Sequence, residues 1–346
     1  SAFTSVVREY LDPLVKADRC AQYVDDIGIA AHSPEELIEN LELVFQQLTK
    51  AGLKLSMNEC EFGQKTIEYL GRTISSSGVA AIEKRVTDYL SKLKPPNSVK
   101  ALQRYLGFVN FYRSYIPRLA EKTAILHELI KKDVPFKLEQ RHKDVMFEIN
   151  ESLLKATKVS LKLPLADKQL VIMCDASEHA AGYVLLIEDY TDRPTGNLKT
   201  YAPVAFGSKK FQGGQMSLTM YAKEFLAMYF AFDEFGHILW GAKKPIIVMT
   251  DNKALTRFFQ AKHIPPSLWN FCDQALQFNF ILAHVPGVEN PAADYLSRLE
   301  IRPEDRVHLK LTDNIPVHHI EIDVASRTPK QEEDEPEFFP PGDPIS

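Results

Sequence analysis

The chain has 346 residues, of which 45% are hydrophobic and 25% are charged, values typical of a globular protein with two or three domains. No apolar run approaches the roughly 18 residues that a membrane helix needs, so no membrane partner is expected. The four cysteines (Cys20, Cys60, Cys174 and Cys272) form no CxxC pair, which argues against a disulfide framework or a zinc site.

The net charge of -5 is distributed unevenly along the chain. Residues 300–346 hold 12 acidic and 5 basic side chains, and residues 301–346 are also rich in proline, so we expect an acidic tail or linker there. Residues 84–132 hold 11 Lys or Arg against 3 acids. This basic stretch is typical of a phosphate-binding surface, although a solvated helix face remains the alternative.

The first third of the chain predicts short strands and one clear helix. Residues 20–31 favour two strands around a turn, with Asp25 and Asp26 at its tip. A helix is predicted over 34–51, because Ser33 can cap it and Pro34 suits its first position. Residues 66–79 then indicate a pair of strands in a hairpin.

Residues 84–158 have a helical pattern, in which Lys100, Arg104 and Arg113 alternate with aromatic side chains. From about residue 165 the pattern becomes α/β. Strands are predicted over 168–177, 181–189, 201–211, 244–252 and 278–285, with a helix over 217–235 and a short helix over 290–299. The predicted fold class is therefore α/β (α+β), with a mixed five-stranded sheet and flanking helices in this last region.

Four acids occupy informative positions in that region. Asp175 and Asp251 end two predicted strands, while Glu224 and Asp294 lie in predicted helices. Carboxylates that converge in one site repel one another unless cations neutralise them, and oxygen ligands suit Mg²⁺ or Mn²⁺. Two such ions roughly 3.5–4 Å apart can hydrolyse a phosphodiester. Any one of these acids alone could equally be a cap or half of an ion pair.

The motifs around these acids resemble a known family. The segments "MCDAS", "YAKEFLAMYFAF", "IIVMTDNKAL" and "AHVPGVENPAADYLSRL" resemble the RNase H domain of Ty3/gypsy-type retrotransposons. Upstream, "YVDDIGIAAHSPEE", "EYLGRTISSSGV" and "LKPPNSVKALQRYLGFVNFYRSYIP" resemble the palm and thumb of the reverse transcriptase of these elements. The resemblance covers residues 1–300, with the motifs in the family's order.

The resemblance implies four segments: a partial palm (1–80), a thumb with connecting helices (81–163), an RNase H domain (164–300) and the tail (301–346). Asp175, Glu224, Asp251 and Asp294 would bind two Mg²⁺ or Mn²⁺ ions and hydrolyse the RNA strand of RNA–DNA hybrids. His284 would assist proton transfer or product release, unless it is an ordinary histidine at a strand end. Many relatives read Glu-Lys-Glu where this chain has Ala222-Lys223-Glu224, and only the second Glu is the expected ligand.

In the palm, the resemblance assigns Tyr23 to Asp26 to the YxDD box, with Asp25 binding metal and Asp26 in support. Glu68 to Arg72 would form the primer grip, in which Tyr69, Leu70 and Gly71, together with Tyr23, would contact nucleic acid. Lys100, Arg104 and Arg113 would follow the duplex backbone from the thumb.

The family's polymerase site also needs an upstream aspartate and a fingers domain, which the segment from Ser1 onward does not contain. Glu9, Asp12 and Asp18 lie in a helix-like stretch and do not replace that aspartate. We therefore expect RNase H-type endoribonuclease activity, and no polymerase activity from this chain alone.

The resemblance also implies the partners: an RNA–DNA hybrid, a primer–template duplex, a second reverse transcriptase subunit, and integrase as a neighbour in the polyprotein. The implied location is the cytoplasm, in virus-like particles, with the nucleus as the alternative. A second hypothesis is a non-catalytic structural or nucleic-acid-binding subunit derived from such an element.

Overall fold

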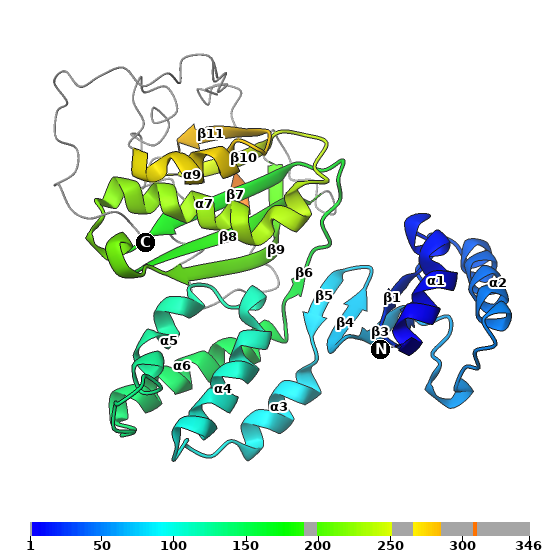
Figure 1. Cartoon of the computed structure of the whole chain (residues 1–346), viewed down its shortest axis with the longest axis horizontal. Helices are drawn as coiled ribbons and strands as arrows, with labels where there is room; N and C mark the ends of the chain where they lie inside the picture. The colour runs from blue at the N-terminus through cyan, green and yellow to red at the C-terminus, as the bar shows by residue number, and fades with distance from the viewer. Residues whose placement is uncertain (1, 190–198, 251–265, 285–306, 310–346) are drawn as a thin grey trace. The chain divides into compact units, whose positions relative to one another are not determined.

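A computed structural model describes residues 2–189, 199–250, 266–284 and 307–309 (Figure 1). The chain divides into two compact units, Ser1–Ser76 and Ser77–Ser346, and each is described by itself. No helix in the described ranges has the length and apolar character that crossing a membrane requires.

The first unit is built on two helices, α1 (Ala2–Lys16) and α2 (Pro34–Lys50). The Ser33 side chain accepts a hydrogen bond from the Glu36 N–H at 3.1 Å, which confirms the predicted cap. The helices pack together through buried apolar side chains that recur at helical spacing: Val7, Leu11, Val44 and Leu48.

Two hairpins and a short 3₁₀ helix, η1 (Met57–Glu59), complete this unit. The first hairpin joins β1 (Ala21–Tyr23) to β2 (Asp26–Gly28), and the second joins β3 (Thr66–Tyr69) to β4 (Arg72–Ser75). Both hairpins lie where the sequence predicts strand pairs.

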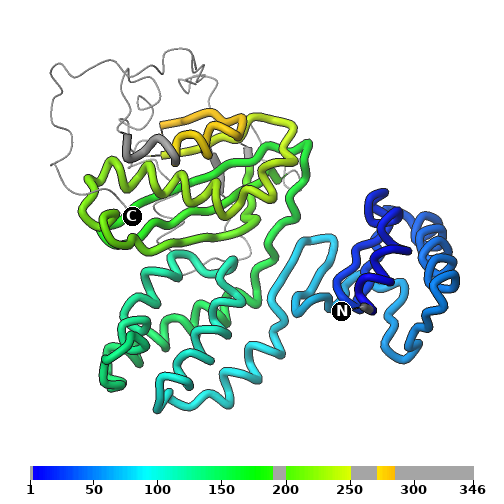
Figure 2. The backbone as a smooth tube through the Cα atoms, viewed as in Figure 1, coloured from blue at the N-terminus to red at the C-terminus, as the bar shows by residue number. Residues whose placement is uncertain are grey.

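The second unit begins with β5 (Gly78–Ala81), which pairs with β6 (Ser160–Leu161). Between these strands lies the predicted helical region, with α3 (Glu83–Lys92), α4 (Val99–Phe111), η2 (Arg113–Tyr115), α5 (Leu119–Glu128) and α6 (Gln140–Ala156). Tyr105 ties α4 to α6, because its buried hydroxyl donates to Asn150 Oδ1 at 3.0 Å. Figure 2 follows the chain from α6 through β6 into the sheet.

The sheet of the second unit has six described strands in the order β11-β10-β7-β8-β9-β12. Their bounds are β7 (Leu170–Ala176), β8 (Ala180–Glu188), β9 (Lys199–Lys210), β10 (Ile246–Thr250), β11 (Phe280–His284) and β12 (Val307–Leu309). β10 is parallel to both β7 and β11, while the other pairs are antiparallel, so the sheet is mixed.

The five strands predicted from the sequence are present, but the count of five is wrong. The sixth strand, β12, pairs with residues 199–201 of β9 and comes from the segment assigned to the tail. A three-residue strand carries almost no periodic signal, and it is stabilised by backbone hydrogen bonds to the long edge strand β9.

Each face of the sheet has its own core. Ile172, Cys174 and Tyr183 face α7 (Met220–Leu239) and α9 (Pro266–Ala275). Val171 and Met173 face the core shared with α4, α5 and α6. The helical region therefore covers one face of the sheet, which explains why β7 is apolar at almost every position rather than at every second one.

Candidate catalytic site

Three strand ends define one edge of the sheet. β7 and β10 are parallel with Met173 opposite Met249, and β10 and β11 are parallel with Thr250 opposite His284. Asp175 follows Met173 by two residues, so Asp175 and His284 lie at the same carboxyl-terminal edge. Ligand sites of open α/β sheets form at such an edge.

Two of the four predicted acids lie outside the described residues. Asp251 follows Thr250 directly in the sequence, and Asp294 comes ten residues after His284. Their predicted places in the site remain predictions.

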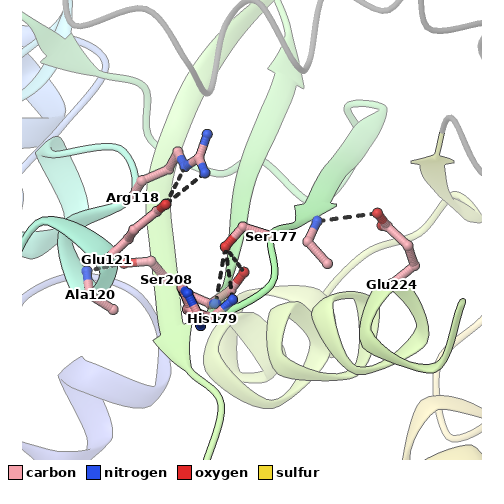
Figure 3. A network of polar contacts seen from close by, with 9 residues as sticks. Arg118, Ala120, Glu121, Ser177, His179, Ser208 and Glu224 are labelled. Atoms are coloured by element: carbon pink, nitrogen blue, oxygen red, sulfur yellow. Dashed lines mark hydrogen bonds and ion pairs between the residues drawn. The ribbon is translucent and has the colours of Figure 1, made fainter. Parts of the chain in front are cut away.

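Glu224 lies in the second turn of α7, whose start is capped by Thr219 accepting a hydrogen bond from the Ala222 N–H at 3.4 Å. The Glu224 residue is 5% exposed, and its Oε1 accepts a hydrogen bond from the Ala176 N–H at 3.3 Å. Figure 3 shows this side chain reaching from its helix to the backbone at the end of β7. Since Ala176 follows Asp175, the Glu224 carboxylate lies one residue along the backbone from the other described member of the predicted acid set.

The donor set fits a hard divalent cation. Asp175 lies near the end of a strand, and the buried Glu224 reaches from its helix to the backbone of the next residue, Ala176. A cation offsets the repulsion between neighbouring carboxylates, and oxygen-only donors favour Mg²⁺ or Mn²⁺. Within the described ranges, no group of three or more His, Cys, Asp or Glu side chains is close enough to hold a metal. Asp175 and Glu224 are therefore the two predicted ligands that the described residues include, and their binding of metal remains a prediction.

The helical region contributes a cation near this edge that the sequence analysis did not assign to this site. Asp175 is paired in register with Gly182 of β8, and a Cβ atom at Gly182 would lie 3.2 Å from the Arg118 side chain. Arg118 begins α5 and pairs with Glu121, its Nε donating to Oε2 at 2.7 Å (Figure 3). The nearby Ser208 hydroxyl accepts from the Ala120 N–H at 2.9 Å. Because nothing in the sequence relates residue 118 to residue 182, this approach could not be predicted.

In the first unit, Asp25 and Asp26 lie on the tight hairpin of β1 and β2. Tyr23 is opposite Asp26, so Val24 and Asp25 form a two-residue turn. Val24 has a φ of 56, a conformation that β-branched residues rarely adopt, and its carbonyl accepts from Gln22 Nε2 at 2.8 Å. Both aspartates are exposed, as a predicted metal-binding tip requires. A strained backbone that carries two acids is typical of a functional turn.

The predicted primer-grip residue Tyr69 lies beside this hairpin. A Cβ atom at Gly28 would contact the Tyr69 ring at 3.5 Å. Burial raises the pKa of the Tyr69 hydroxyl, and the negative charge of Asp26 raises it further. Leu70 and Gly71 form the turn of the next hairpin with φ angles of 49 and 76. The residues assigned to the YxDD box and to the primer grip therefore lie side by side within the first unit.

On α4, Lys100 and Arg104 are exposed, as predicted. Gln103, Gly107 and Phe111 lie on the same side of the helix at a spacing of four, and a Cβ atom at Gly107 would meet nothing within 4 Å. Phe111 is one of the aromatic residues that alternate with the basic ones in the sequence, whereas Gln103 and Gly107 carry no charge or ring that would have marked them.

Arg113 differs from the other two basic residues, because its Nη2 donates to Glu234 Oε2 at 3.1 Å. This ion pair joins η2 to α7. The predicted contact of Arg113 with nucleic acid remains a prediction.

Comparison with known proteins agrees with this arrangement. Residues 1–74 match the family model for reverse transcriptase (RNA-dependent DNA polymerase), and residues 166–278 match the RNase H-like domain found in reverse transcriptase. The chain thus contains a segment that matches reverse transcriptase and a segment that matches the RNase H-like domain of reverse transcriptases. It is 27% identical over 280 residues to the retrovirus-related Pol polyprotein from transposon 412 of Drosophila melanogaster. It is 29% identical over 281 residues to the transposon Tf2-3 polyprotein of Schizosaccharomyces pombe.

These alignments cover 81% and 80% of this chain but only 22% and 20% of the two polyproteins, so the chain spans about a fifth of the length of these relatives. Among solved structures, it resembles the foamy viral protease-reverse transcriptase in complex with RNA/DNA hybrid, with a TM-score of 0.67 and 21% identity over 84% of this chain and 38% of the other. The same enzyme in complex with double-stranded DNA gives a TM-score of 0.67 at 20% identity over 83% of this chain and 58% of the other. These likenesses show a reverse transcriptase and RNase H-like fold.

Proposed function

We propose that the RNase H-like domain hydrolyses the RNA strand of RNA–DNA hybrids with the help of Mg²⁺ or Mn²⁺. The observation that carries this proposal is the hydrogen bond from the Ala176 N–H to Glu224, which fixes a buried carboxylate of α7 beside the end of the strand that holds Asp175. Asp251 and Asp294 are assigned to the same site by their sequence motifs.

When bound, two divalent ions would supply an activated water and a stabilised leaving oxygen. The protein's own residues would bind the ions, transfer a proton and bind the duplex. Asp175 and Glu224 would hold the ions at the sheet edge, and His284, at the same edge, would accept or deliver a proton. Lys100 and Arg104 bind backbone phosphates of the duplex from α4, and the neutral face of Gln103 and Gly107 allows the duplex to approach.

For the first unit, we propose that Asp25 binds a metal ion at a polymerase-type site and that Tyr69 supports the hairpin carrying it. The contact of Tyr69 with Gly28 and its electrostatic coupling to Asp26 favour this assignment. A second reverse transcriptase subunit and integrase are the protein partners that the family resemblance suggests.

The test uses the full chain and a hybrid whose RNA strand is labelled at its 5′ end. We expect cleavage with Mg²⁺, and Glu224→Gln should lose more than the roughly 10- to 100-fold that loss of a supporting residue costs at a metal site. Asp233→Asn is the matched control, because Asp233 lies on the same helix with a side chain 51% exposed and pairs with Lys209. Hybrid binding without cleavage by the folded wild type would favour the structural-subunit hypothesis instead.

A further inference from the structure

Lys223 is a buried lysine next to the proposed ligand Glu224. It is 4% exposed, within the second turn of α7. Removing an ammonium group from water is costly unless hydrogen bonds compensate, so a lysine at this level of burial needs a structural reason.

The Lys223 ammonium group is bound to the turn that follows Asp175. Its Nζ donates to the Glu178 carbonyl at 2.8 Å and lies 5.6 Å from the centre of the Phe211 ring. The Phe211 N–H in turn donates to the His179 carbonyl at 3.0 Å. The carbonyls of Glu178 and His179 therefore each accept a hydrogen bond, the first from a side chain of α7 and the second from the backbone of the residue after β9.

The turn is also closed from within by Ser177 (Figure 3). The Ser177 hydroxyl accepts from the Ala180 N–H at 3.1 Å, and the Ser177 N–H donates to the Ala180 carbonyl at 2.8 Å. Two residues of α7 therefore form hydrogen bonds with this segment. Glu224 binds the N–H of Ala176, one residue after Asp175, and Lys223 binds the carbonyl of Glu178, three residues after it.

From this geometry we propose that Lys223 is a positioning residue for the metal site, an inference that rests on the proposed function. It holds the turn against α7 and so fixes the separation of the Asp175 and Glu224 carboxylates before any ion binds. Mg²⁺ requires ligand oxygens at about 2.0–2.1 Å in near-ideal octahedral geometry, so a loosened turn lowers its affinity. Lys223 does not touch the reacting atoms.

The test compares two variants. Lys223→Met keeps an unbranched side chain of similar size and removes the ammonium donor, whereas Lys223→Arg keeps a cationic hydrogen-bond donor. Lys209→Met is the matched control, because Lys209 also lies over an aromatic ring, that of Phe230 at 4.4 Å, but its side chain is 48% exposed and pairs with Asp233 of α7 instead of a carbonyl of the turn. Binding of Mn²⁺ to the full-length protein is followed by the electron paramagnetic resonance signal of free Mn²⁺. Cleavage of hybrid is measured in parallel as a function of Mg²⁺ concentration.

We expect Lys223→Met to weaken Mn²⁺ binding by roughly 10-fold or more. Its cleavage should require correspondingly more Mg²⁺ and approach the wild-type maximum when Mg²⁺ saturates. Lys223→Arg should recover most of the affinity, and Lys209→Met should match the wild type. Ser177→Ala opens the turn without changing the buried charge, so it should weaken Mn²⁺ binding in the same direction, and it decides the matter if Lys223→Met does not fold.

Wild-type Mn²⁺ affinity and an unchanged Mg²⁺ requirement in Lys223→Met, or in Ser177→Ala, would overturn the inference. Failure of the proposed function gives a different result: a folded wild type that neither cleaves hybrid nor loses Mn²⁺ binding on Glu224→Gln substitution.

Discussion

At Gly207 of β9, the packing of the second unit leaves no room for one added carbon. Gly207 lies opposite Tyr183 of β8, whose ring crosses directly over it. A Cβ atom at residue 207 would lie 2.1, 2.7 and 2.9 Å from three atoms of this ring, well inside van der Waals contact. Gly207→Ala therefore forces the ring to move.

The Tyr183 ring is packed against its neighbours, so moving it disturbs other contacts. Tyr183 is 1% exposed and packs edge-to-face on Phe235, with ring centres 5.6 Å apart. Its hydroxyl donates to Glu234 Oε2 at 2.6 Å, and burial and the charge of Glu234 raise the pKa of this hydroxyl, so it stays a donor. Overpacking costs about 1–3 kcal/mol, and a strained hydrogen bond to a charged group about 1.5–3 kcal/mol. We expect a total loss of about 3–5 kcal/mol.

The assay is urea unfolding followed by tryptophan fluorescence. Both tryptophans of the sequence, Trp240 and Trp269, belong to the second unit, so the signal reports on that unit. In a Tyr183→Leu background the same Gly207→Ala change should cost less than about 1 kcal/mol, because the clashing ring is gone. Gly107→Ala is the control, because a Cβ atom at residue 107 would meet nothing within 4 Å. This substitution should stabilise α4 by about 0.5–1 kcal/mol, since alanine favours a helix more than glycine does. Equal costs of Gly207→Ala in the two backgrounds would refute the reasoning.

Two further predictions concern charged groups of the helical region. Burial lowers the pKa of Lys122 to about 8, so between pH 8 and 10.5 the unfolded chain binds more protons than the folded one and wild-type stability rises with pH. Lys122→Met should therefore be more stable than wild type at pH 7 by up to about 3 kcal/mol, and this advantage should shrink by about 2 kcal/mol by pH 9.5 in urea unfolding. An advantage that is independent of pH would contradict the assignment. For hybrid binding, Lys100→Ala and Arg104→Ala should each lower the slope of log affinity against log salt by about one, whereas Lys209→Ala should not. Unchanged slopes measured by fluorescence anisotropy would remove α4 from the binding surface.

Local signals in the sequence were sufficient for most elements. Ser33 and Pro34 predict the start of α2 because capping depends on neighbouring residues only. The pairing of β3 with β4 follows from a two-residue turn that contains Gly71. The proximity of Glu224 to the end of β7 was expected from the motifs, since acids at strand ends and on the following helix converge in an α/β fold.

Contacts between segments that are distant in the chain could not be predicted from the sequence. The cover of one sheet face by α4, α5 and α6 depends on matching two apolar surfaces, and hydrophobic periodicity shows only that each surface exists. The ion pair of Arg113 with Glu234 joins residues 121 positions apart, and an exposed arginine in a basic stretch gives no sign of it. The role inferred for Lys223 also needed the structure, because a lysine in a helix normally indicates a solvated face.

Hydrolysis of the RNA strand of hybrids is tested most directly with one RNA, labelled at its 5′ end, in three forms: paired with DNA, paired with RNA, and single-stranded. The full chain and its Glu224→Gln variant are each incubated with these substrates and Mg²⁺, after both are shown to be folded. We expect the wild type to cleave the hybrid and neither of the other two substrates, and we expect the variant to cleave none of the three. Equal cleavage by the variant, or equal cleavage of the single-stranded RNA, would contradict the proposed function.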